Sequence, residues 1–138
     1  AEREGLTNLL VLRLDAAQSV GLFPPGTLSG VFVNFPDPWG KRRWHKHRYL
    51  TEAFFSDLSL ILRPGGFFSF KTDHREFFEA VRLLIESSPK FRITKLSLEL
   101  QSSKFGEENV LTEFESLFNN RGFPVFFLEA KTIVAPPV

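Results

Sequence analysis

Hydrophobic and polar positions along the chain follow two patterns, one typical of strands and one typical of helices. Short apolar runs over 8–14, 30–35 and 67–71 predict strands, and the near-continuous run 30–35 predicts one that is covered on both faces. Apolar residues recur at helical spacing over 47–62 and 74–86, which predicts two helices. We also expect a short helix over 16–22, strands over 91–100 and 124–132, and a helical piece over 112–118.

This alternation of strands and helices predicts an α/β layered domain with a largely parallel sheet. A chain of 138 residues is the size of one domain, so we treat 1–138 as a single unit. No apolar run approaches the length of a membrane span. The chain has no cysteine, which excludes disulfide scaffolds and thiolate metal sites and is compatible with a reducing compartment.

Three carboxylates follow predicted strands, namely Asp15, Asp37 and Asp73. In sheets of this class, ligands lie outside the carboxyl ends of the strands. The sequence therefore predicts a site where these acids meet. The same residues also allow local roles, because Asp73 with Glu76 fits a helix capping box and Asp37 fits a stiff turn.

Charge is concentrated in one segment, 41–48, which holds five basic side chains and no acid. Because the whole chain carries only +1, its remaining part is acidic. The segment is either a solvated surface or a binding site for the phosphates of a polyanion, with Trp44 or a histidine stacking on a base. His45 and His47 lack a third ligand nearby in the sequence, so we predict no metal site.

The segment 36–48, PDPWGKRRWHKHR, carries the most information. Proline on both sides of Asp37 fixes φ at two positions and predicts a rigid kink that holds the carboxylate beside a strand end. The segment resembles the PDPWxKxRHxKRR signature of the tRNA (guanine-N7-)-methyltransferases, with Trp44 and His47 where that signature has His and Arg. Three further stretches fit the same family, namely GLTN with the run ending at Asp15, RPGG with the run ending at Asp73, and 112–115, which matches TKFE with glutamate in place of lysine.

The resemblance implies a class I (Rossmann-like) fold dependent on S-adenosyl-L-methionine, with a mostly parallel sheet and an antiparallel C-terminal strand. It implies methyl transfer to N7 of guanine in the variable loop of tRNA, and a cytoplasmic location. The implied roles are catalysis for Asp37, cofactor binding for Asp15 and Asp37, and substrate binding for Lys41, Asp73, Thr112, Glu113, Phe114 and Glu115. Phosphate contacts are expected from Arg42, Arg43, Lys46 and Arg48.

In this resemblance, Ala1 falls after the glycine-rich turn and second strand of the family, so we expect an amino-terminally truncated fold. In the family's fold, its first two strands, which would precede Ala1, lie in the sheet between the run ending at Asp15 and the strand ending before Asp37. Without them the sheet has an open edge, pairs its remaining strands directly or borrows a strand from another copy, so we expect self-association or a non-standard sheet. We also expect the isolated chain to bind the cofactor poorly and to have little or no activity. The alternative is a non-catalytic RNA-binding module, or a degenerate paralogue that keeps the basic segment.

Overall fold

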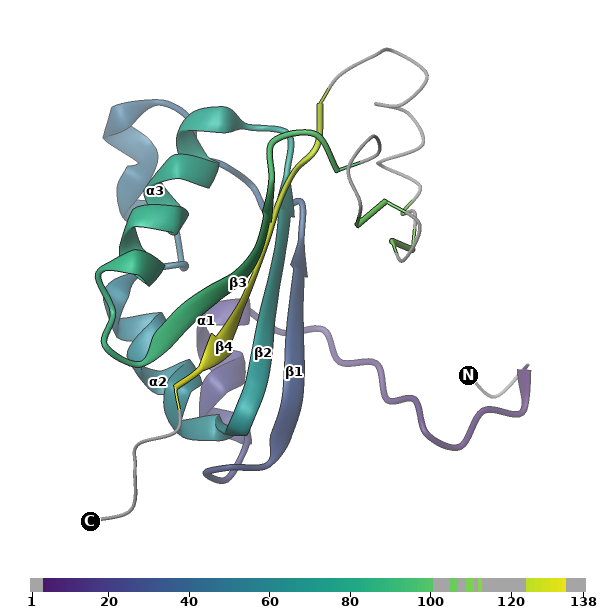
Figure 1. The fold of residues 1–138 in the computed structure, drawn as a ribbon. Helices are drawn as coiled ribbons and strands as arrows, with labels where there is room; N and C mark the ends of the chain where they lie inside the picture. The colour runs from purple at the N-terminus through teal and green to yellow at the C-terminus, as the bar shows by residue number, and fades with distance from the viewer. Residues whose placement is uncertain (1–3, 101–104, 107–108, 111, 113–123, 134–138) are drawn as a thin grey trace.

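A computed structural model describes residues 4–100, 105–106, 109–110, 112 and 124–133 of the chain (Figure 1). A four-stranded sheet carries helices on one face. The elements in chain order are α1 (Ala16–Ser19), the 3₁₀ helix η2 (Val20–Leu22), β1 (Leu28–Asn34), the 3₁₀ helix η3 (Arg42–His47), α2 (Glu52–Ile61), β2 (Leu62–Thr72), α3 (Arg75–Glu86), β3 (Phe91–Ser97) and β4 (Phe126–Thr132).

The strands lie in the order β1-β2-β4-β3. β1 pairs with β2 in parallel, and β4 lies antiparallel between β2 and β3. Three of these strands therefore run in one direction and only β4 is reversed. This arrangement confirms the expectation of a mostly parallel sheet with an antiparallel C-terminal strand.

The core forms between this sheet and the helices α2 and α3 (Figure 1). Thr51 caps the start of α2, and its side-chain oxygen accepts a hydrogen bond from the Phe54 amide at 3.2 Å. Successive side chains of β2 point to opposite faces, so alternate positions enter the core. Phenylalanine fills most of this space, and the largest fully buried rings are those of Phe55, Phe68, Phe70, Phe77 and Phe78.

The prediction of a strand over 8–14 is wrong. This segment has no regular secondary structure and runs away from the sheet (Figure 1). Its side chains are exposed, Leu10 to 80% and Val11 to 78%. Apolar composition makes a segment suitable for a strand, but a strand forms only where its backbone groups pair with a neighbour. The predicted helix that follows, over 16–22, is present as α1 and η2.

β1 forms one edge of the sheet, and Phe32 on it is 66% exposed. An apolar edge offers its backbone groups to another chain. We expect the protein to self-associate through this edge, with a mass in light scattering that rises with concentration. Phe32→Lys should shift the equilibrium toward one chain, whereas Leu83→Lys, at a 61% exposed position on α3, should not. A wild-type mass of one chain at every concentration would contradict this expectation.

Candidate functional site

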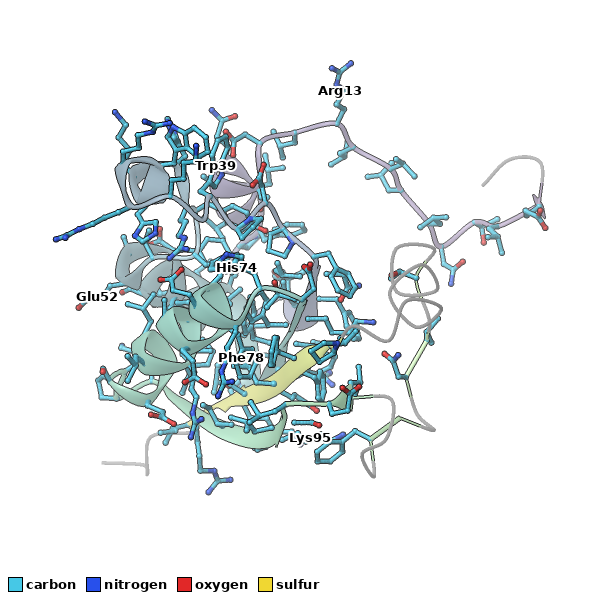
Figure 2. All side chains as sticks on the ribbon, turned by 90° about the horizontal axis from the view of Figure 1, so that it is seen from above. Arg13, Trp39, Glu52, His74, Phe78 and Lys95 are labelled. Carbon is cyan, nitrogen blue, oxygen red and sulfur yellow. The ribbon has the colours of Figure 1, made fainter. Side chains whose placement is uncertain are left out.

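The site forms where β1 and β2 end side by side. Asn34 is in register with Lys71, and the Phe35 amide donates to the Lys71 carbonyl at 2.8 Å. Because the two strands are parallel, Asp37 and Asp73 follow them at the same end of the sheet, where the carboxyl ends of β1 and β2 lie. Figure 2 shows the molecule from above this end.

The loop after β1 packs against the segment after β2. A Cβ added at Gly40 would lie 2.9 Å from His74 Nε2, so only glycine fits there without a shift. Figure 2 labels Trp39 and His74 from these two segments. The third acid, Asp15, precedes α1, and burial and then the Asp15 carboxylate raise the pKa of the Tyr49 phenol. The structure therefore brings Asp37 and Asp73 to one end of the sheet and places Asp15 within electrostatic reach of Tyr49, which follows Arg48 in the chain.

The backbone of the loop after β1 is unusual. Phe35 and Trp39 have φ values of 52° and 44°, in the left-handed region that non-glycine residues rarely adopt. Proline at position 36 disfavours right-handed helical geometry at Phe35, and this residue is left-handed. Asp37 is exposed, and its Oδ1 accepts a hydrogen bond from the Trp39 amide at 3.2 Å. Such a conformation costs about 1–3 kcal/mol per residue and persists only where its surroundings hold it.

Arg48 ties this loop to the beginning of α3. Its Nε donates to the Pro38 carbonyl at 2.8 Å, and its Nη2 donates to Glu76 Oε2 at 2.6 Å. The guanidinium carbon lies 4.7 Å from the centroid of the Phe77 ring. The Arg48 side chain is only 9% exposed. Arg48 was expected to contact phosphate, but its side chain is hydrogen-bonded within the protein and mostly buried.

The remaining cations of the basic segment surround an aromatic cluster. The Trp39 ring centroid lies 6.3 Å from that of Trp44 and 4.8 Å from that of His47. Lys41 Nζ and the Arg43 guanidinium carbon each lie 4.9 Å from the Trp44 ring. Lys41, Arg42, Arg43 and Lys46 are all exposed on or beside η3. This arrangement is a cationic surface with aromatic rings, which suits stacked bases between phosphates.

The start of α3 differs from the capping-box prediction. The helix cap is His74, whose Nδ1 accepts from the Phe77 amide at 3.1 Å, rather than Asp73. The His74 amide in turn donates to Thr72 Oγ1 at 3.2 Å. The sequence analysis did not predict this role for His74. The Asp73 carboxylate is exposed.

The sheet face opposite the helices contains a hollow of about 590 Å³. Its charged groups include Lys71, which is 5% exposed and donates from Nζ to Asn109 Oδ1 at 3.0 Å and to the Val110 carbonyl at 3.3 Å. Asn34 and Thr112 also line it, so the hollow reaches the carboxyl end of β1. Its aromatic lining consists of Phe32, Phe67, Phe105 and Phe127.

Of the four residues in the predicted substrate motif, only Thr112 lies in the described part of the chain. Glu113, Phe114 and Glu115 fall outside the described residues. Sequence reasoning also missed Asn34 and Lys71. The sequence did contain a sign of Lys71. It is a cation within an apolar run, at a position that points to the face opposite the core-facing phenylalanines of β2.

Asp15 and Asp37 are exposed carboxylates that could bind a cationic or amine-bearing group. Asp15 accepts from the Ala17 amide at 2.9 Å through Oδ1 alone. A carboxylate has two oxygens, so Asp15 and Asp37 retain acceptor capacity for an amine and negative charge for a sulfonium. Within the described ranges, no three histidine, aspartate or glutamate side chains form a metal-binding group. No helix in those ranges is long and apolar enough to cross a membrane.

Comparison with known proteins gives one family match and several structural matches. A family model described as "Putative methyltransferase" matches residues 1–128. The [4+2]-cyclase SpnF matches with a TM-score of 0.52 at 10% identity, over 97% of this chain and 60% of that chain. A complex titled as containing the Haloferax volcanii Trm112 methyltransferase activator and "the putative methyltransferase" matches with a TM-score of 0.44 at 12% identity, over 81% of this chain and 57% of that chain. A geranyl diphosphate methyltransferase in complex with GPP and sinefungin matches with a TM-score of 0.43 at 15% identity, over 81% of this chain and 49% of that chain.

The structural match to SpnF bears on the fold of the chain, and the family model bears on its family. The likeness to SpnF, together with the observed strand order, shows a Rossmann-like α/β fold of the class I methyltransferase type, as expected. The chain belongs to the methyltransferase family whose model it matches. It spans 49% to 60% of the length of these solved structures.

Proposed function

We propose that the protein acts in the transfer of a methyl group from S-adenosyl-L-methionine to N7 of guanine in the variable loop of tRNA. The observation that carries this proposal is the loop after β1. It holds the Asp37 carboxylate at the carboxyl end of the strands, beside the cationic and aromatic surface around Trp44. Membership of a methyltransferase family supports methyl transfer as the reaction class.

Methylation at this position needs little acid–base help from the protein. The bound cofactor supplies an electrophilic methyl group on a sulfonium. Guanine N7 has a free lone pair, so the new nitrogen–carbon bond forms as the carbon–sulfur bond breaks, and the base becomes cationic. The protein must therefore align the reacting atoms and stabilise positive charge on the purine. The fixed, exposed carboxylate of Asp37 suits the second task.

The other residues divide between cofactor and substrate in this proposal. Asp15 would accept from the adenine amino group, and Asp37 would face the sulfonium. Lys41, Asp73 and Thr112 would contact the guanosine region, together with the motif residues 113–115. The hollow lined by Thr112 and Lys71 has aromatic walls suited to a base. A tRNA substrate also implies a cytoplasmic location.

The alternative function is RNA binding without catalysis. The cationic surface around Trp44 favours it equally, because that surface requires only a polyanion. The two functions differ at Asp37, because methyl transfer needs its negative charge and phosphate binding does not. Appearance of N7-methylguanosine separates them, since a binding module would produce none.

Removing the cations of the surface should weaken tRNA binding. In Lys41→Ala/Arg42→Ala/Arg43→Ala we expect lower affinity and a weaker dependence on salt. Each lost phosphate contact lowers the slope of log affinity against log salt concentration by roughly 0.7–0.9. Fluorescence anisotropy of a labelled tRNA transcript at several salt concentrations measures both quantities.

A matched control removes three exposed cations from the other end of the molecule. Lys90→Ala/Arg92→Ala/Lys131→Ala changes net charge by the same amount at positions on and before β3 and on β4. Its salt slope should stay close to that of the wild type. Equal losses in the two triple variants would indicate attraction by overall charge and would contradict a specific surface.

A further inference from the structure

The Arg48 side chain joins three parts of the site that are distant in sequence. It follows η3 directly, its Nε donates to the Pro38 carbonyl at 2.8 Å, and its two terminal nitrogens lie 2.6 and 3.4 Å from the Glu76 carboxylate oxygens. Its guanidinium packs over the ring of Phe77, which is 2% exposed. These contacts connect the loop after β1 to the first turn of α3 and to the core.

The loop needs such an external attachment. Two of its residues, Phe35 and Trp39, have left-handed φ values. The carbonyl that Arg48 holds belongs to Pro38, the residue directly after Asp37. A loop in a strained conformation relaxes when its supporting contacts are removed, and the Asp37 carboxylate would move with it.

We propose that Arg48 is a positioning residue, which fixes Asp37 and Trp39 for methyl transfer by clamping the Pro38 carbonyl to Glu76 at the start of α3. This inference rests on the proposed function for its catalytic consequence. It replaces a phosphate-binding role for Arg48 with a role inside the protein.

Only arginine has the geometry for this clamp. Its planar guanidinium donates in several fixed directions, so it reaches a carbonyl and a carboxylate at once while stacking on a ring. Lysine keeps the charge but has a single ammonium group. The hydrogen bond from Arg48 lowers the pKa of the Glu76 carboxyl, which is what a contact that favours the ionised carboxylate does.

Tryptophan fluorescence tests the inference without cofactor or tRNA. The chain has two tryptophans, Trp39 and Trp44, and both lie at this loop and η3. In Arg48→Ala and Arg48→Lys we expect an emission maximum shifted to longer wavelength and an increased acrylamide quenching constant. Circular dichroism should show that these variants remain folded.

Two further variants keep the test decisive. Glu76→Gln preserves size and removes the ionic partner, so its emission should shift in the same direction even if Arg48→Ala fails to fold. Arg82→Lys changes an arginine on α3 that pairs with Glu86, and its emission should stay at the wild-type value. A folded Arg48→Ala or Glu76→Gln with wild-type emission and quenching would overturn the proposal.

Kinetics of the protein expressed from its whole gene separate positioning from phosphate binding. We expect Arg48→Lys to lose about tenfold or more in kcat with little change in KM for tRNA, as misplacement of a reacting group predicts. Wild-type kcat in Arg48→Lys with a raised KM in Arg48→Ala would indicate a phosphate ligand and overturn the proposal. If the wild type transfers no methyl group while the fluorescence shifts occur, the clamp stands and the proposed function fails.

Discussion

Asp37→Ala should lower kcat for methyl transfer by about 100-fold or more, because it removes the negative charge beside the purine that becomes cationic. The fold should survive. Asp37 is exposed and makes one local hydrogen bond, to the Trp39 amide, so its truncation opens no cavity. Initial rates of methyl incorporation into tRNA, measured with the protein expressed from its whole gene, give kcat, and thermal unfolding checks the fold.

A matched control for this variant is Asp57→Ala. Asp57 is an exposed carboxylate on α2 and takes no part in the proposed site. Its kcat should equal that of the wild type. Near-normal turnover by a folded Asp37→Ala would show that the carboxylate is not required, and the catalytic assignment would fail.

Phe70→Ala should destabilise the protein by about 3–5 kcal/mol, the range for truncating a buried aromatic side chain. The ring is fully buried, with centroids 5.5 Å from Phe77 and 6.3 Å from each of Phe68 and Phe78. Because domains of this kind are stable by only about 5–15 kcal/mol, this loss is a large fraction of the total. Urea unfolding followed by circular dichroism measures the change.

The control for the core variant lies on the outer side of α3. Leu83 is 61% exposed, so Leu83→Ala removes few packing contacts and should change stability by less than about 1 kcal/mol. Equal destabilisation by the two variants would mean that the phenylalanine core does not lie between β2 and the two longer helices.

Sequence pattern predicted the layered fold well because the core is a phenylalanine-rich interface with clear periodicity. α2, α3, β1, β3 and β4 all appear within the predicted ranges or near their ends, whereas β2 begins at Leu62, well before the predicted strand 67–71. The failure at 8–14 has a physical cause. Pairing partners decide whether an apolar segment becomes a strand, and a local pattern contains no information about them.

The sequence predicted that Asp37 and Asp73 lie at one end of the sheet, but it did not predict the contacts that hold the residues around them. The positions of Asp37 and Asp73 just after predicted strands identified these two residues, and the prolines on both sides of Asp37 predicted the stiff loop. The roles of Arg48 and His74 depend on contacts with residues distant in sequence or on cap geometry, which composition does not reveal. Charge alone suggested phosphate for every cation of the basic segment, whereas the structure shows Arg48 bound to Glu76.

The most direct test is the identity of the methylated nucleoside. The protein expressed from its whole gene is incubated with labelled S-adenosyl-L-methionine and an unmodified tRNA transcript that has guanine in its variable loop, and the RNA is digested to nucleosides. Our account predicts label in N7-methylguanosine from the variable loop, and its loss in Asp37→Ala. Label in any other nucleoside, or none from a folded wild-type protein that binds tRNA, would contradict it.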